Sequence, residues 1–186
     1  MITPPIVFGP KAVSSTQGPG LVWWVLPGIL GGMPMPYLHI DRRMNHGGLI
    51  NAYDDDLPLL FSEGVRAVVS LLNIPSDTIV YHMAGFDFLC LPVPEGAAPT
   101  MAQSKEFVDF VNQERAQRKP VVVHCEAGVG RTGTMIAAYL ISQGATAETA
   151  IRQVRSVERV AVETAAQIRF LEDYASSRSP GGDFKH

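Results

Sequence analysis

The stretch PVVVHCEAGVGRTG, residues 120–133, gathers the residues of this chain that are best suited to chemistry. Cys125 follows a run of valines and one histidine, and Arg131 comes six positions later, with glycines between and after them. A short β-branched run, then glycines, then an apolar helical pattern predicts a strand, a turn and the start of a helix. Backbone N–H groups at such a turn can converge on a bound anion, and the glycines relax the backbone that must turn them inward.

An anion site that also holds a thiol and a guanidinium favours phosphoryl transfer. Arg131 can offer a planar fork of N–H donors to two oxygens of a bound oxyanion. The positive end of the following helix favours the thiolate of Cys125 over the thiol. One loop could therefore bind a phosphate and supply the nucleophile for a covalent thiophosphate. The simpler alternative is a glycine-rich turn around a buried cysteine. A Walker nucleotide loop is excluded, because no Gly-Lys-Ser/Thr occurs.

Alternating strands and helices are expected to position this loop. Short apolar runs predict strands at residues 21–26, 67–72, 86–93 and 121–124. Helices are expected at residues 100–118, 132–142, 147–157 and 164–176. Asp54, Asp55 and Asp56 are interpreted as acidic residues capping one more helix, with Pro58 in its first turn. The alternation predicts an α/β fold with a sheet and helices packed on it.

The length of 186 residues suits one domain. We expect a flexible arm at residues 1–20, a catalytic domain at 21–177 and a flexible tail at 178–186. The net charge of −3 gives no general attraction to nucleic acid or to an anionic membrane. Two cysteines are too few for a disulfide scaffold, so a reducing, cytoplasmic setting is expected. A monomer is also expected. No histidine spacing suggests a metal, and we see no secretory signal.

The motif HCEAGVGRTG, residues 124–133, resembles the H-C-(x)5-R-[ST]-G signature of cysteine-dependent protein tyrosine phosphatases. The segments WVLPGILGGMPMP, GVRAVVSL and LPVPEGAAPT resemble the entry strand, the second strand and the acid loop of small atypical dual-specificity phosphatases. The similarity runs from about residue 23 to residue 174. It implies the protein tyrosine phosphatase fold, with a central, mostly parallel sheet flanked by helices, and an enzyme that needs neither cofactor nor metal.

The resemblance also implies residue roles. Cys125 would be the nucleophile and Arg131 the phosphate clamp, while Thr132 would steady the thiolate as it leaves the phosphoenzyme. His124 would orient the loop and tune the thiol, or else bond only to backbone. The phosphate oxygens would be held by the backbone amides of Glu126, Ala127, Gly128, Val129, Gly130 and Arg131.

Two positions depart from the family pattern. The general acid of the family is an aspartate about thirty residues before the cysteine, where this chain has Glu95. Glu95 is therefore the candidate acid, or a plain exposed carboxylate, with Asp87 and Asp77 as weaker candidates. Near the last helix the family reads Arg-Pro-Gly before Thr-x-x-Gln, and only the second part is present here. Gln167 is a candidate for placing the hydrolytic water, or only a member of a capping box.

The substrate expected from this loop is phosphotyrosine in a protein, with phosphoserine and phosphothreonine also open. Glu126 and the absence of lysine disfavour polyanionic substrates such as phosphoinositides or RNA 5′ phosphates. A different class of function is a pseudophosphatase that binds phosphoproteins without efficient turnover. Thiol redox chemistry would instead require Cys90 to lie close to Cys125, where it could trap oxidised Cys125 as a disulfide.

Overall fold

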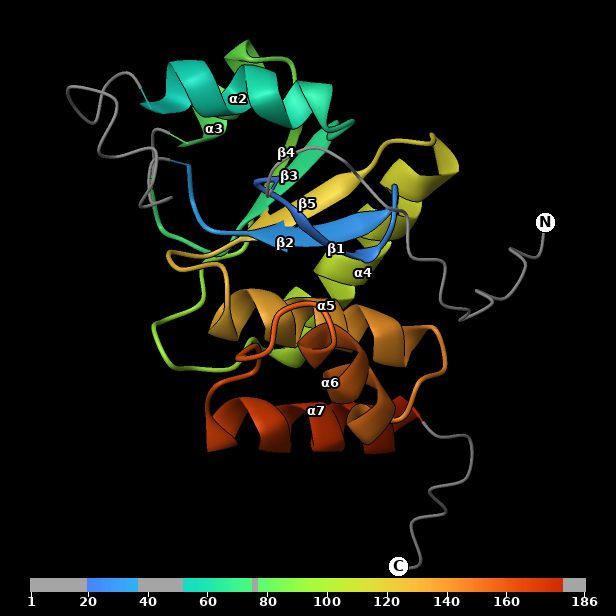
Figure 1. Ribbon diagram of the computed structural model, residues 1–186. Coiled ribbons are helices and arrows are strands. Elements are labelled where there is room, and N and C mark those ends of the chain that lie inside the picture. The colour runs from blue at the N-terminus through green and yellow to red at the C-terminus, as the bar shows by residue number, and fades with distance from the viewer. Residues whose placement is uncertain (1–19, 37–51, 75–76, 179–186) are drawn as a thin grey trace, which may run out of the picture.

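The computed structural model describes residues 20–36, 52–74 and 77–178 (Figure 1), and the side chains of residues 52–55 are not among the described parts. Five strands form one sheet in the order β1-β2-β5-β3-β4. β1 runs antiparallel to β2, and every other neighbouring pair is parallel. The strands are β1 (Trp23–Leu26), β2 (Leu30–Met33), β3 (Ala67–Ser70), β4 (Asp87–Cys90) and β5 (Val121–His124). The predicted α/β class with a mostly parallel sheet is confirmed.

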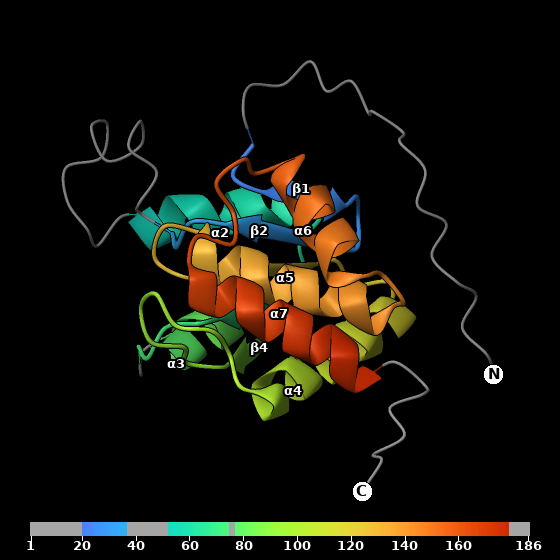
Figure 2. The same cartoon turned by 90° about the horizontal axis from the view of Figure 1, so that it is seen from below.

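Helices cover both faces of this sheet. In Figures 1 and 2, α2 and α3 lie on one face, and α4 to α7 lie on the other. Their bounds are α2 (Ala52–Ser62), α3 (Asp77–Met83), α4 (Met101–Ala116), α5 (Gly130–Ser142), α6 (Ala147–Arg155) and α7 (Ala165–Arg178). α5 is buried along nearly its whole length, between the sheet and the pair α6 and α7. None of these helices is long and apolar enough to cross a membrane.

The central strand β5 explains the run of valines before Cys125. β5 pairs with β2 on one side and β3 on the other, so both of its faces are covered. Val122 packs in the core beside α2 and α3, whereas Val121 and Val123 pack in the core beside α4 to α7. A strand that is buried on both faces carries a continuous apolar run instead of an alternating one.

Two elements were missed by the sequence patterns. β2 contains Gly31 and Gly32, which contribute no apolar side chains to the pattern. The Trp23 ring of β1 covers Gly32 so closely that a Cβ there would overlap it. α3 is only seven residues long and has too little periodicity to be recognised.

Other boundaries shift. α2 begins at Ala52, so the three aspartates lie inside the helix and Pro58 is interior, which corrects the predicted cap. α5 begins at Gly130 instead of residue 132. The predicted arm and tail lie outside the described residues, except for Gly20 and for Arg178, which ends α7.

Candidate active site

Cys125 lies directly after β5, where the chain turns into α5. Its side chain is 3% exposed, and it packs in the core beside α5. We call residues 125–130 the glycine loop. The loop ends at the N-terminus of α5, where the first backbone N–H groups of a helix have no intrahelical partner and the helix dipole is positive. The sequence elements that were expected to surround Cys125 are therefore in place.

Close contacts hold the glycine loop in shape. Gly128 has φ +74°, and a Cβ there would overlap the backbone of Met33 and Pro34. The Met35 N–H donates to the carbonyl of Glu126 at 3.0 Å, which ties the loop to the exit of β2. Gly128 must be glycine both for its left-handed backbone and for the approach of a neighbouring chain segment.

Arg131 joins the glycine loop to the loop that carries Glu95. Its Nη1 donates to the carbonyl of Val93 at 3.0 Å, and the side chain is half-buried. Glu95 lies two residues beyond that carbonyl and is exposed. Arg131 and the segment bearing Glu95 are thus brought together, although the two residues are far apart in the sequence.

His124 supports the glycine loop from the opposite face of the sheet. Its Nδ1 lies 3.3 Å from the carbonyl oxygen of Cys125, and its Nε2 lies 3.0 Å from Tyr81 Oη. Since a carbonyl can only accept, Nδ1 carries the proton and Nε2 accepts from the tyrosine hydroxyl. Burial lowers the pKa of His124 to about 4, against the opposing effect of the bond to the Cys125 carbonyl. His124 is therefore a neutral ring that orients the backbone, and it brings no positive charge to the thiol near neutral pH.

Thr132 lies in the first turn of α5. Its hydroxyl is buried and, within the described part of the chain, has no hydrogen-bond partner. Thr134, two residues later, instead donates to the carbonyl of Gly130 at 2.7 Å. An unsatisfied buried hydroxyl carries a free-energy cost, so its presence beside Arg131 invites a functional explanation.

The loop at residues 92–99, which we call the Glu95 loop, is tied down through its carbonyl groups. Gln103 Nε2 donates to the carbonyl of Pro92 at 2.7 Å. Thr164 Oγ1 donates to the carbonyl of Gly96 at 3.0 Å, and Gln167 Nε2 donates to the carbonyl of Ala97 at 3.2 Å. The loop is therefore anchored to α4 and to the start of α7, while the side chain of Glu95 remains exposed.

Gln167 is 1% exposed and takes part in a dense local network. Its Oε1 accepts from the backbone N–H groups of Glu163 and Thr164, at 2.8 and 3.2 Å, and its backbone N–H donates to Thr164 Oγ1 at 3.2 Å. These are the reciprocal bonds of a capping box, which the sequence indicated. The additional bond to Ala97 was not visible in the sequence, because it joins residues seventy positions apart.

The two alternative acids do not share the surroundings of Cys125. Asp87 begins β4 and pairs through Ala67 with Val121, at the opposite end of β5 from Cys125. That is roughly 13 Å along the strand. Its carboxylate forms an ion pair with Lys119 at 2.5 Å. Asp77 is buried at the start of α3, where Ser70 Oγ donates to it at 3.4 Å. Asp77 therefore lies on the face of the sheet opposite to Cys125. Both residues were weaker candidates than Glu95.

Cys90 lies on the wrong face of the sheet to trap Cys125. It pairs with Ser70, and Ser70 pairs with His124, so Cys90 and His124 share a face. Cys125 follows His124 and points to the other face. The two cysteines are two strands apart, about 10 Å, whereas a disulfide needs Cα atoms within about 7 Å. Burial, and then the charge of Asp77, raise the pKa of Cys90, which further lowers its reactivity. The predicted disulfide trap is wrong.

Glu163 belongs to the segment before the last helix that matches the family pattern, but the sequence assigned it no role. It follows Val162, which has φ +60°, and it precedes α7. A Cβ built on Gly130 would overlap the Glu163 carboxylate, so that carboxylate rests against the last glycine of the glycine loop. The sequence feature that could have pointed to Glu163 as a site residue is its position just before the Thr-x-x-Gln capping box.

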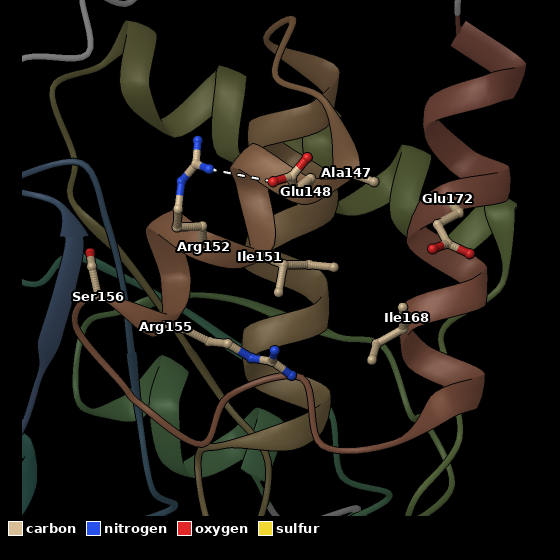
Figure 3. Close-up of a pocket in the computed structure, with 8 residues that line it drawn as sticks. All are labelled: Ala147, Glu148, Ile151, Arg152, Arg155, Ser156, Ile168 and Glu172. Atoms are coloured by element: carbon tan, nitrogen blue, oxygen red, sulfur yellow. Dashed lines mark ion pairs between the residues drawn. The ribbon is translucent and has the colours of Figure 1, made fainter.

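A pocket of about 620 Å³ lies elsewhere, in a groove between α6 and α7 (Figure 3). Ile151 and Ile168 give it an apolar wall, and Arg152 pairs with Glu148 at 3.5 Å on its rim. None of its lining residues belongs to the glycine loop or the Glu95 loop. Across the described ranges, no three metal-ligating side chains lie close enough together to hold an ion.

A buried cysteine directly after the central strand, an arginine in the first turn of the following helix and this sheet order together are the features of a phosphatase of the protein tyrosine phosphatase superfamily. The family model described as the DSP-PTPase phosphatase of polymorphic toxin systems (Tc-R-P) matches residues 43–145, and the chain belongs to that family.

Individual relatives include both protein and lipid phosphatases. The mouse dual specificity protein phosphatase CDC14B is 29% identical over 63% of this chain and 23% of its own length. The phosphatidylglycerophosphate phosphatase PTPMT2 of Arabidopsis thaliana is 30% identical over 67% of this chain and 57% of its own length. The chain thus spans less than two thirds of these relatives. The crystal structure of Tk-PTP in its active form is 25% identical with a TM-score of 0.68, covering 84% of this chain and 97% of that one.

Proposed function

We propose that this chain is a protein phosphatase that hydrolyses phosphotyrosine through a cysteinyl-phosphate intermediate. The observation that carries the proposal is the position of Cys125, buried between the carboxyl end of β5 and the N-terminus of α5, with Arg131 in the first turn of that helix. The first N–H groups of a helix have no intrahelical partner, and the helix dipole is positive at that end. These are the features that stabilise both a thiolate and a bound phosphate.

The reaction proceeds in two halves. In the first, the amides of residues 126–131 and the Arg131 fork hold the phosphate oxygens while the Cys125 thiolate attacks phosphorus. The phenolic oxygen leaves with a proton from Glu95. In the second half, water attacks phosphorus and the thiolate departs. The buried, unpartnered hydroxyl of Thr132 donates to the thiolate at that moment, which accounts for the cost of leaving it unsatisfied.

The carboxylates in and beside the glycine loop favour a phosphoprotein over a lipid headgroup with several phosphates. Glu126 is exposed within the glycine loop, and Glu95 and Glu163 are exposed on two segments next to it. No lysine occurs from residue 120 to residue 140. Carboxylates at this rim repel additional phosphates, whereas they tolerate or attract a peptide. Because relatives include lipid phosphatases, the preference for a peptide over a lipid substrate is measured directly.

Three substrates test the proposal: a phosphotyrosine peptide, p-nitrophenyl phosphate and phosphatidylglycerophosphate in detergent micelles. We expect turnover of the first two without added metal, and a kcat/KM for the peptide at least tenfold above that for the lipid. Cys125→Ser should abolish turnover but still bind the peptide. Peptide binding without turnover by the wild type would instead identify a pseudophosphatase, and a preference for the lipid would overturn the substrate assignment.

A further inference from the structure

Glu163 is a carboxylate whose position the fold maintains but whose side chain has no structural partner. It is exposed, and within the described ranges its carboxylate forms no hydrogen bond or ion pair. Nevertheless it rests against Gly130, the residue that ends the glycine loop and begins α5. A free carboxylate that touches the phosphate-binding loop is unusual, because it repels the phosphate that the loop attracts. Some benefit must offset that repulsion.

The backbone around Glu163 is held from several directions. Arg155 donates through Nε to the carbonyl of Ala161 at 2.9 Å and through Nη2 to that of Val162 at 2.7 Å. Ala161 packs so closely on Gly133 that a Cβ there would lie 2.7 Å from its methyl group. The Glu163 N–H donates to Gln167 Oε1 at 2.8 Å. The turn before α7 therefore presents this side chain to α5 in a defined position.

Glu163 also borders the Glu95 loop. Its neighbour Thr164 donates to the carbonyl of Gly96, the residue after Glu95. Two exposed carboxylates, Glu95 and Glu163, thus lie on neighbouring segments that a hydrogen bond of 3.0 Å joins. Gln167, the residue first considered for placing water, is almost fully buried and already uses its carbonyl oxygen and one N–H. Between these two side chains, only Glu163 offers solvent a free acceptor.

We propose that Glu163 accepts the proton of the hydrolytic water in the second half of the reaction, an inference that rests on the proposed function. The water oxygen bonds to phosphorus as its proton moves to the Glu163 carboxylate. The S–P bond breaks, and its electron pair returns to Cys125 as the thiolate. Glu95 serves the first half by protonating the leaving group, and Glu163 serves the second. The separation explains why a carboxylate is retained beside the phosphate.

Rapid-quench kinetics with p-nitrophenyl phosphate test the assignment, because a good leaving group makes the first half fast. Glu163→Gln should lower kcat by roughly 10–100-fold and leave kcat/KM within about twofold, since general base catalysis typically contributes about 10²-fold or more. A burst of about one equivalent of nitrophenol should precede the slow phase, with phosphate trapped on Cys125. Glu172→Gln removes the same charge from α7 and should change neither parameter. Added formate should restore part of the kcat of Glu163→Ala.

Three results would overturn the inference. An unchanged kcat without a burst would remove Glu163 from the second half of the reaction. An increase in kcat/KM without loss of kcat would mean that the carboxylate only repels the substrate. An equal fall in kcat and kcat/KM, without formate rescue, would assign Glu163 to the first half or to folding. Absence of wild-type turnover is a separate result, because it contradicts the proposed function itself.

Discussion

The glycine loop and the Glu95 loop are connected through Arg131, but different interactions hold them. The glycine loop is enclosed by backbone: Gly128 contacts the exit of β2, and Gly130 begins a helix buried along its length. The Glu95 loop is exposed at its tip and is held through its carbonyls by Arg131, Thr164 and Gln167. If the proposed function holds, binding of the phosphate depends on packing, whereas delivery of the proton depends on a few side-chain hydrogen bonds. Substitutions in the glycine loop should therefore affect mainly stability, whereas substitutions in the Glu95 loop should affect mainly the reaction rate.

The largest expected effect is in the Glu95 loop. Glu95→Gln should lower kcat/KM for a phosphotyrosine peptide by roughly 10²–10⁴-fold, the usual contribution of a placed acid. The loss on p-nitrophenyl phosphate should be much smaller, because nitrophenolate leaves without much protonation. Asp87→Asn is the matched control and should stay within about twofold, since Asp87 lies at the far end of the sheet. Equal losses of less than about threefold on both substrates would exclude Glu95 as the acid.

Alanine substitution of one glycine in each loop should lower the free energy of unfolding by different amounts. Gly128 and Gly96 have similar backbones, with φ +74° and +70°, but a Cβ at Gly96 meets open space. Gly96→Ala should cost about 1 kcal/mol for its left-handed backbone alone. Gly128→Ala adds overlap with the backbone of Met33 and should cost about 2–4 kcal/mol. Urea denaturation measures both. Equal losses would show that close packing does not define the glycine loop.

His124 makes the support of the glycine loop dependent on pH. Its pKa of about 4 in the folded chain lies below the ordinary value of 6.5. A depressed pKa stabilises the fold fully above pH 6.5, and this contribution is lost as the pH falls through 4. The loss approaches roughly 3 kcal/mol. The unfolding free energy of the wild type should therefore fall more steeply than that of His124→Asn between pH 6.5 and 4. Parallel curves for the two proteins would contradict a buried, neutral ring.

The smallest effect should come from one anchor of the Glu95 loop. Thr164→Val removes the hydroxyl that donates to the Gly96 carbonyl and accepts from the backbone N–H of Gln167. Loss of one hydrogen bond of this kind costs about 1 kcal/mol, or roughly fivefold in rate. The decrease should appear in kcat/KM for the peptide more than for p-nitrophenyl phosphate. Thr164→Ser keeps the hydroxyl and should stay close to wild type. A uniform loss on both substrates would mean that the anchor serves the whole site.

The same contrast explains what could be predicted from the sequence. The strand, glycine loop and helix around Cys125 are contiguous in the chain, so their pattern was visible and the structure has all three elements. β2 could not be recognised, because Gly31 and Gly32 are covered by a tryptophan of another strand. The contact of Glu163 with Gly130 joins residues more than thirty positions apart. The hydrogen bonds from Arg131, Thr164 and Gln167 to the Glu95 loop span even longer separations. Local periodicity reports none of these, because each depends on tertiary packing.

The hydrogen bond from the Met35 amide to the Glu126 carbonyl has a consequence for the order of folding. It closes a loop of about ninety residues, as does the parallel pairing of Leu30 with Val121. Such distant pairings form slowly, because the chain loses loop entropy before it gains contacts. Helical structure should therefore return early in refolding, while the walls of the phosphate cradle meet only when β2 docks beside β5. A kinetic intermediate of this chain would have helical circular dichroism yet be unable to bind vanadate.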